Sequence, residues 1–277
     1  MSNRHDDRSF AALDGVRFPE FEPGTVWLVG AGPGAPGLLT LLGYHALTRA
    51  DAVVYDALVG TEILDWVPQG TILEYAGKRG GKPSAHQSDI STRLVELARA
   101  GKRVLRLKGG DPFMFGRGGE ECQTLAAAGV AFRIVPGITA GIGGVGYVGI
   151  PVTHRDTNHS VLFLTGHDSS GTVPAGVNWS AVATAAPVLV MYMAVKNLPD
   201  IAARLIDGGR APSDAVAIVS HATLPEQKVV ESTLGGVGVL AESGALTTPA
   251  IVVVGPTVSL RQDVGRYVER MGVGRVG

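Results

Sequence analysis

Short apolar runs alternate with amphipathic stretches along most of the chain. In the first half, the runs that read as buried strands lie at residues 25–29, 52–55, 71–75, 103–107 and 132–135. The stretches at 38–49, 88–100 and 119–128 carry apolar side chains at helical spacing, as Ile90, Leu94 and Leu97 illustrate. Because strands and helices alternate, the pattern predicts a mostly parallel α/β sheet.

A glycine-rich bridge at 136–151 interrupts the alternation, which then resumes with different strands. These strands are predicted at 161–164, 188–193, 215–219, 228–231 and 250–254. The second half does not repeat the first. The chain is therefore predicted to form two α/β domains, at 24–136 and 137–265, between a flexible N-terminal tail at 1–23 and a C-terminal tail at 266–277.

Four glycine loops begin where predicted strands end, at Gly30, Gly109, Gly137 and Gly166. In open α/β sheets, ligands bind beyond the carboxyl ends of the strands. Because the four loops come from both domains, they predict a ligand cleft between the domains.

Composition fits a globular protein with a substantial core. Of the 277 residues, 45% are hydrophobic and 18% are charged. The 39 glycines are about twice the usual share of roughly 7%. The single cysteine, Cys122, excludes an internal disulfide and is typical of a reducing compartment. Neither a signal-peptide pattern nor an apolar run of membrane-spanning length is present, which predicts a cytoplasmic protein with no membrane partner.

The net charge of −1 argues against nucleic acid as a partner. Basic residues nevertheless gather beside the glycine loops, and they are Lys78, Arg79, Lys82, Lys102, Arg103, Arg106, Lys108 and Arg117. This grouping favours an anionic small-molecule ligand over ordinary solvated surface charge.

Residues 30–35, read GAGPGA, satisfy the dinucleotide-binding fingerprint, and Asp56 follows where a ribose-binding acid would stand. An NAD- or FAD-dependent enzyme is therefore one interpretation. Pro33 and Pro36 weaken it, since both remove N–H donors that a pyrophosphate needs and interrupt the helix start.

Residues 107–121, read LKGGDPFMFGRGGEE, form the most specific motif. Gly109 and Gly110 let main chain approach a ligand, and Asp111 adds an acceptor. The apolar residues at 113–115 supply a wall, and Arg117 can bind a carboxylate through two hydrogen bonds. Glu121 reads as a charge that favours a helix N-terminus.

The histidines do not predict a metal site. His154 and His167 lack metal-ligand spacing, and Cys122 has no second cysteine to pair with. Thr139, after the turn that follows 132–135, reads as a helix cap whose hydroxyl can also contact a ligand.

Three segments together resemble the tetrapyrrole methylase family. They are VWLVGAGPGAPGLLTL, the motif at 107–121, and VPGITAGIGGVGYVGIPVTHRD, and the similarity runs from about 26 to 261 in the family's order. The resemblance implies two α/β domains with a cleft between them, and a homodimer. It also implies transfer of methyl groups from S-adenosyl-L-methionine to C2 and C7 of uroporphyrinogen III, giving precorrin-2 through precorrin-1.

The resemblance also implies roles for individual residues. Cofactor contacts, mostly through main chain, fall on Pro33, Gly109, Gly110, Asp111, Met114, Thr139, Ala140, Met193, Ala222 and Ala250. Catalytic positions fall on Asp56 as proton acceptor, Lys78 as proton donor, Arg117 and Glu120. Substrate-side positions fall on Arg155 and His167.

One position departs from the family's pattern. The first loop usually carries an acid after GPG, and this chain has Ala35. A methylase of a later corrin intermediate is the nearest alternative, and a non-catalytic cofactor-binding module is another. Whether the product feeds cobalamin, sirohaem or haem d1 stays open at this stage.

Overall fold

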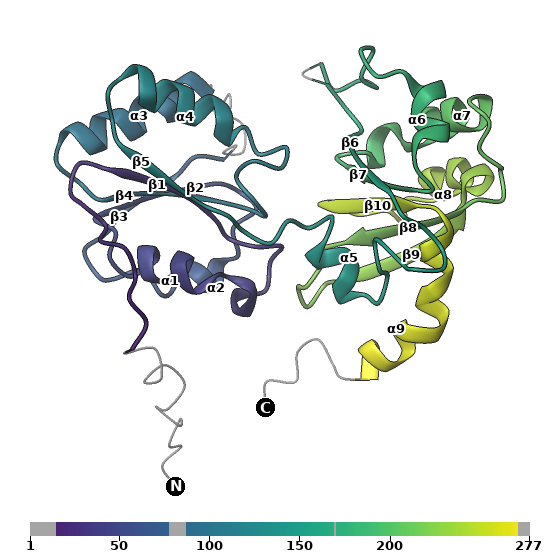
Figure 1. Ribbon diagram of the computed structural model, residues 1–277, viewed down its shortest axis with the longest axis horizontal. Coiled ribbons are helices and arrows are strands. Elements are labelled where there is room, and N and C mark those ends of the chain that lie inside the picture. The colour runs from purple at the N-terminus through teal and green to yellow at the C-terminus, as the bar shows by residue number, and fades with distance from the viewer. Residues whose placement is uncertain (1–14, 78–86, 169, 271–277) are drawn as a thin grey trace, which may run out of the picture.

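The computed structural model describes residues 15–77, 87–168 and 170–270, which form two α/β units side by side (Figure 1). The first unit contains β1 (Val26–Gly30), η2 (Pro36–Leu38), α1 (Leu41–Leu47), β2 (Ala52–Tyr55), α2 (Thr61–Leu64), β3 (Ile72–Tyr75), α3 (Gln87–Arg99), β4 (Val104–Lys108), α4 (Gly118–Ala127) and β5 (Phe132–Val135). The second contains α5 (Gly143–Tyr147), β6 (Val161–Thr165), α6 (Trp179–Ala185), β7 (Val188–Tyr192), η3 (Val195–Asn197), α7 (Leu198–Asp207), β8 (Ala215–Ser220), β9 (Lys228–Thr233), η4 (Leu234–Gly236), α8 (Val237–Glu242), β10 (Ala250–Val254), η5 (Pro256–Leu260) and α9 (Arg261–Arg270).

The first sheet is parallel throughout, in the order β3-β2-β4-β1-β5. Helices α1 and α2 cover one face, and α3 and α4 cover the other (Figure 1). Because both faces are covered, every residue of β1 is buried, which explains its unbroken apolar run. Parallel strands also bring the loops after β1, β2, β4 and β5 to one edge of the sheet.

The second sheet, in the order β6-β7-β10-β8-β9, is mostly antiparallel. Only β6 and β7 run parallel, whereas β7, β10, β8 and β9 pair antiparallel with their neighbours. The prediction of a mostly parallel sheet is therefore right for the first unit and wrong for the second. The reason is that β7 and β10 are covered on both faces, so their apolar runs carry no information about strand direction.

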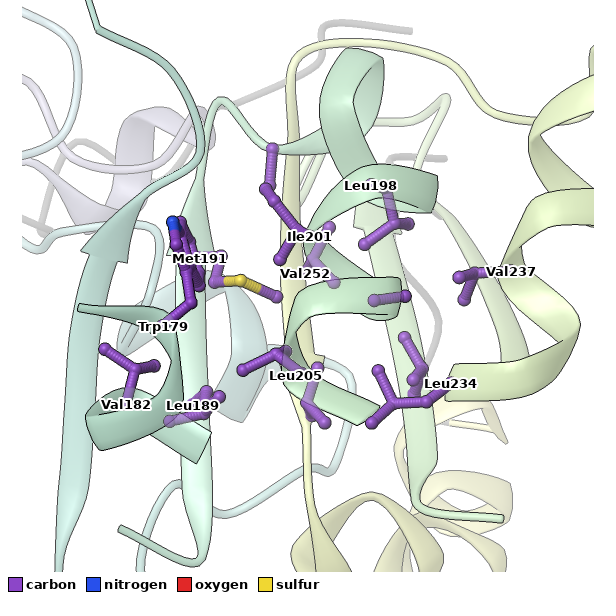
Figure 2. Close-up of a cluster of buried hydrophobic side chains, with 14 of the residues drawn as sticks. Trp179, Val182, Leu189, Met191, Leu198, Ile201, Leu205, Leu234, Val237 and Val252 are labelled. Atoms are coloured by element: carbon purple, nitrogen blue, oxygen red, sulfur yellow. The ribbon is translucent and has the colours of Figure 1, made fainter. Parts of the chain in front are cut away.

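Helix α7 anchors one face of the second sheet. Its apolar residues Leu198, Ile201 and Leu205 recur at helical spacing and pack against β7 and β10, where Met191 and Val252 lie (Figure 2). All five side chains are fully buried, and each contributes about 1.5–3 kcal/mol through removal of apolar surface from water. This packing fixes β7, and therefore the position at which residues 192 and 193 leave the sheet.

The glycine-rich bridge belongs to the second unit's core. Val145, Val148 and Ile150 are buried and pack on the face of the second sheet opposite α7. The chain itself therefore covers much of the apolar surface of the bridge.

Both ends of the described chain carry more structure than flexible tails would. Phe18 stacks on His45 and Phe21 stacks on Trp27, each pair with ring centroids 4.6 Å apart. Helix α9 continues to Arg270, past the boundary predicted at 265.

Candidate active site

The loop between β4 and α4 is braced by its own aspartate. Asp111 Oδ1 accepts a hydrogen bond from Phe113 N at 2.8 Å, and Oδ2 accepts one from Gly137 N at 3.0 Å. The carboxylate therefore ties this loop to the chain that leaves β5. A cofactor can use only the remaining lone pairs of Asp111.

Three glycines pack main chain against main chain where β1, β4 and β5 end. A Cβ atom on Gly30 would lie 2.5 Å from the Gly110 carbonyl oxygen and 2.5 Å from Gly137 Cα. Gly110 also has a φ of +66°, which favours glycine. The sequence interpretation assigned these glycines to ligand approach, but Gly30 and Gly137 are required first by the approach of other loops.

The loop at 30–35 uses most of its N–H groups within the protein. Gly32 N donates to Gly110 O at 3.2 Å, and Gly110 N donates back to Gly32 O at 2.7 Å. Ala31 N donates to Lys108 O at 2.7 Å. A dinucleotide pyrophosphate requires free donors at this place, so the fingerprint does not carry its usual function here.

The same loop reaches the second unit through Ala35, the position where the family's acid is missing. Its N–H donates to Thr223 Oγ1 at 2.9 Å. Thr223 is buried, and its own N–H donates to Gln227 Oε1 at 2.8 Å. Ala35 thus contributes main chain to a contact between the two units.

Tyr192, the last residue of β7, joins both units at the site. Its hydroxyl lies 2.6 Å from Thr139 Oγ1 and accepts a hydrogen bond from Gly141 N at 2.9 Å. Its ring lies 5.0 Å from that of Phe115 in the β4–α4 loop. Burial raises the pKa of Tyr192, so the hydroxyl stays protonated near neutral pH.

The other predicted cofactor residues come from both units. Pro33 lies in the loop after β1, and Met114 and Ala140 pack on the second sheet. Met193 follows β7, and 45% of its surface is exposed. Ala222 follows β8, and Ala250 begins β10 opposite Ser220. Ala222 lies against α5, because a Cβ on Gly144 would come within 2.6 Å of it. The structure therefore gathers the predicted positions where the loops of both sheets meet.

Asp56 lies at the end of β2, beside the start of the β4–α4 loop. Its Oδ1 accepts hydrogen bonds from Leu58 N at 3.1 Å and from Gly109 N at 3.2 Å. This places a carboxylate at the first glycine of the most specific motif. The carboxylate can support the loop and accept a proton from a neighbouring ligand.

Arg117 and Glu120 pair with each other. Arg117 Nε and Nη2 donate to the two Glu120 carboxylate oxygens at 2.9 and 2.6 Å, and about half of each side chain is exposed. The hydrogen bond from Arg117 lowers the pKa of Glu120, and the bond to Glu120 raises that of Arg117. The guanidinium can still reach a ligand carboxylate, but only by sharing or exchanging this partner.

The basic residues do not form one anion-binding group. Arg103 precedes β4, at the opposite end of the strand from the site, and pairs with Asp51 at 2.8 Å. Arg106 and Lys108 are buried and pair with Glu121 at 3.0 and 3.2 Å. The predicted grouping is wrong for these residues, because strand position separates side chains that are close in the sequence.

The predicted substrate residues lie in separate loops. Arg155 is exposed between β6 and the bridge. His167 follows β6, and its Nδ1 is buried without a hydrogen-bond partner among the residues that the structure describes. Lys78, like Arg79 and Lys82, lies outside the described residues.

A hollow of about 430 Å³ lies at the other edge of the first sheet, away from these loops. Asp51, Lys102 and Arg103 line it, and two of these charged side chains, Asp51 and Arg103, form an ion pair with each other.

Within residues 15–77, 87–168 and 170–270, no group of three or more histidine, cysteine, aspartate or glutamate side chains could hold a metal ion. The described helices include none that is long and apolar enough to cross a membrane.

Sequence reasoning missed two features of the site. It gave Tyr192 no role, and it interpreted Glu121 as a charge at a helix start without its burial, although the side chain has no exposed surface. The available signal was the pair of cations at 106 and 108 inside an otherwise buried strand, since such charges require a nearby carboxylate.

Comparisons with known proteins support the resemblance. The sequence model of the Tetrapyrrole (Corrin/Porphyrin) Methylases matches residues 25–238. The uroporphyrinogen-III C-methyltransferase of a Sinorhizobium species is 61% identical, over 92% of this chain and 89% of the relative. The sirohaem synthase of Thiobacillus denitrificans is 46% identical over 88% of this chain, which spans half of that relative's length.

A solved structure is also similar along nearly its whole length. The uroporphyrin-III C-methyl transferase of Thermus thermophilus, crystallised with S-adenyl homocysteine, has a TM-score of 0.74 and 36% identity. The match covers 85% of this chain and 99% of the other. The α/β fold with two units that the resemblance implied is confirmed, and this chain belongs to the tetrapyrrole (corrin/porphyrin) methylases.

Proposed function

We propose that this protein is an S-adenosyl-L-methionine-dependent uroporphyrinogen-III C-methyltransferase, which methylates C2 and C7 and forms precorrin-2 through precorrin-1. The observation that carries the proposal is the meeting of loops from both units around Tyr192, next to the motif at 107–121. The relative that shares 61% of its residues with this chain bears that name. The related structure with 36% identity is a complex with the product of such a methyl donor.

The cofactor is proposed to bind where these loops meet. Gly109, Gly110 and Asp111 offer main chain on one side, and Thr139 and Ala140 offer it on the other. Pro33, Met114, Met193, Ala222 and Ala250 complete the proposed cofactor set. The exposed Met193 side chain, at the end of a fully buried strand, supports the fit, because an apolar ligand face would cover it.

Bound S-adenosyl-L-methionine supplies an activated methyl group, so the protein's task is alignment followed by removal of a proton. We assign proton acceptance to Asp56, which the Leu58 and Gly109 N–H groups hold in place. Lys78 is proposed as the proton donor on the resemblance alone. Arg117 and Glu120 are proposed to contact the substrate where the β4–α4 loop meets the start of α4.

The substrate is a large ring system that carries many carboxylates. Phe113 and Ile142, about half exposed, offer an apolar surface to such a ring. Arg155 and His167 are proposed to meet carboxylates, and the buried, unsatisfied Nδ1 of His167 supports this role.

The direct test is a reaction of the purified protein with uroporphyrinogen III and isotopically labelled methyl donor. We expect two methyl groups in the final product and a singly methylated intermediate at early times. A product methylated only when a later corrin intermediate is supplied would favour the nearest alternative instead.

Asp56→Asn tests the assigned base. Asparagine keeps an oxygen that can accept from Gly109 N, so affinity for S-adenosyl-L-homocysteine should stay near that of the wild type. Turnover should fall by about 100-fold or more, the usual contribution of a positioned general base. Unchanged turnover would remove Asp56 from this role.

A homodimer and a cytoplasmic location complete the proposal. The exposed Phe132 and Ile134 on β5, an edge strand, support a contact between copies. Light scattering that gives a mass near 28.6 kDa at micromolar concentration would contradict the dimer. The single, buried cysteine supports a reducing compartment.

A further inference from the structure

Three charged side chains, Arg106, Lys108 and Glu121, form a buried group that we call the clasp. Glu121 Oε1 lies 3.0 Å from Arg106 Nε and 3.2 Å from Lys108 Nζ. The side chains are 3%, 4% and 0% exposed. A fully desolvated ion group of this kind is unfavourable unless its geometry is well satisfied, so it needs a reason beyond stability.

The clasp closes the base of the β4–α4 loop. The loop at 109–117 starts directly after Lys108 and leads into α4, where Glu121 lies in the first turn, so the ion pair joins the two elements that flank the loop. Arg106 Nη1 also donates to the carbonyl oxygen of Val54 at 3.2 Å. That bond connects the clasp to β2, two residues before Asp56.

The charges around Lys108 come from three elements. Arg106 lies on the same strand, Glu120 and Glu121 lie on α4, and Asp56 follows β2. Cys122 also lies on α4; burial and the Glu121 charge raise the pKa of its thiol, and the Lys108 charge acts in the opposite direction. Burial and the Arg106 charge lower the pKa of Lys108, while Glu121 and Asp56 act in the opposite direction.

We propose that the clasp positions the cofactor loop, and that Lys108 is the positioning residue that holds the loop in its binding form. Lys108 acts through its pairing with Glu121 and its place next to Gly109, without touching the cofactor. This inference rests on the proposed assignment of residues 109–111 to the cofactor site.

Lys108→Met is the most informative variant, because it removes one cation and leaves Arg106 paired with Glu121. We expect the Kd for S-adenosyl-L-homocysteine, measured by calorimetric titration, to rise by about tenfold, the equivalent of one charge-assisted hydrogen bond. Asp51→Asn is the matched control. It breaks the ion pair between β2 and β4 at their opposite ends, so it should reduce stability and leave the Kd unchanged.

Lys108→Arg separates positioning from general structural support. In the wild type, affinity for S-adenosyl-L-homocysteine should fall at alkaline pH as Lys108 loses its proton. Arginine stays charged, so Lys108→Arg should bind normally at neutral pH and lose affinity less steeply at alkaline pH. The ligand's own amine titrates identically with both proteins, and only the difference between the curves reports on Lys108.

The outcomes can be told apart. If Asp111→Ala weakens binding but Lys108→Met does not, the clasp inference is overturned while the cofactor assignment stands. If neither variant changes the Kd, the cofactor assignment itself fails. If Lys108→Met does not fold, identical pH curves for the wild type and Lys108→Arg overturn the inference.

Discussion

At the scale of single residues, the site concentrates backbone conformations that side chains avoid. Phe115, Arg117, Met193, His221 and Thr223 all have positive φ angles although none is glycine. Each costs on the order of 1 kcal/mol and persists only where its surroundings hold it. All five lie in the loops after β4, β7 and β8, where ligand contacts are proposed.

The Arg117 side chain should matter for chemistry and little for folding. Its exposed pair with Glu120 contributes about 0–1 kcal/mol, so Arg117→Ala should change the free energy of unfolding by less than about 1 kcal/mol. Methyl transfer should fall tenfold or more, with affinity for S-adenosyl-L-homocysteine nearly intact. Turnover, calorimetric titration and urea unfolding on one preparation check this.

Arg117→Gly is the matched variant, since its φ of 59° suits glycine. It should lose as much activity as Arg117→Ala while being at least as stable. Arg117→Lys should restore activity only in part, because lysine lacks the planar fork. A parallel loss of cofactor affinity, stability and turnover would instead assign Arg117 to bracing the loop.

Residue identity alone could not show which charges are buried. Arg103 and Arg106 are three positions apart, yet their side chains have different surroundings. Arg103 pairs with Asp51 just before β4, where both side chains are partly exposed, whereas Arg106 is buried within the first unit. The partner of Arg106 stands fifteen residues later, across a loop. Such pairing depends on tertiary structure, whereas the glycines at 109 and 110 are a local signal of close main-chain approach that the sequence itself shows.

At the scale of elements, Tyr192 couples β7 to the chain after β5. Tyr192→Phe removes the hydroxyl that Gly141 N and Thr139 use, leaving a buried N–H group unsatisfied. We expect a loss of about 1–3 kcal/mol in the free energy of unfolding. Weaker binding of S-adenosyl-L-homocysteine should accompany it, because Thr139 and Ala140 lose their support.

Thr139→Val offers the comparison, as it removes the partner hydroxyl but leaves Gly141 N bonded to Tyr192. It should therefore destabilise the protein less than Tyr192→Phe. Equal losses would show that the Gly141 bond contributes nothing.

The ion pair between Asp51 and Arg103 should give acid-dependent stability at the start of β2 and β4. The hydrogen bond from Arg103 lowers the pKa of Asp51 to about 2. A carboxyl group whose folded pKa is depressed stabilises above its unfolded pKa and loses that contribution as pH falls through the folded value. Asp51→Asn should be less stable than the wild type at pH 6 by about 1 kcal/mol after allowance for solvent screening.

That difference should shrink between pH 4 and pH 2, where the wild-type carboxyl becomes protonated. Urea unfolding of both proteins across this range measures it. A difference that stays constant down to pH 2 would mean that the lost contact is not the ion pair.

Element positions were largely predictable, because buried strands leave unbroken apolar runs and surface helices leave periodic ones. The strand predicted at 52–55 coincides with β2, which is mostly buried. The strand predicted at 132–135 coincides with β5, although only Val135 of its four residues is buried. The apolar pattern alone did not predict strand direction in the second unit, since a run such as β10 is equally apolar in either direction. Connection length gave the missing signal, as β8 and β9 are joined too closely for a parallel crossover.

At the scale of the whole molecule, both units contribute to the proposed cofactor site, so ligand binding should stabilise them together. S-adenosyl-L-homocysteine at about 100 times its Kd should add about 2.7 kcal/mol and raise Tm by several degrees. NAD should leave Tm unchanged, because the N–H groups of Ala31, Gly32 and Ala35 are engaged within the protein. Differential scanning calorimetry checks both, and a rise in Tm with NAD would revive the dinucleotide interpretation.

The contact of Gly30 with Gly110 and Gly137 has a consequence for redesigning this enzyme. Any side chain at Gly30 or Gly137 collides with neighbouring main chain, whereas a Cβ at Gly119 or Gly146 meets open space. In a library that samples these four glycines, the first two positions should yield almost no active clones, and the last two, which lie in helices α4 and α5, should tolerate alanine freely. Efforts to widen the range of accepted tetrapyrroles are therefore best directed at exposed side chains such as Phe113 and Ile142, which can change without moving the junction of the strands.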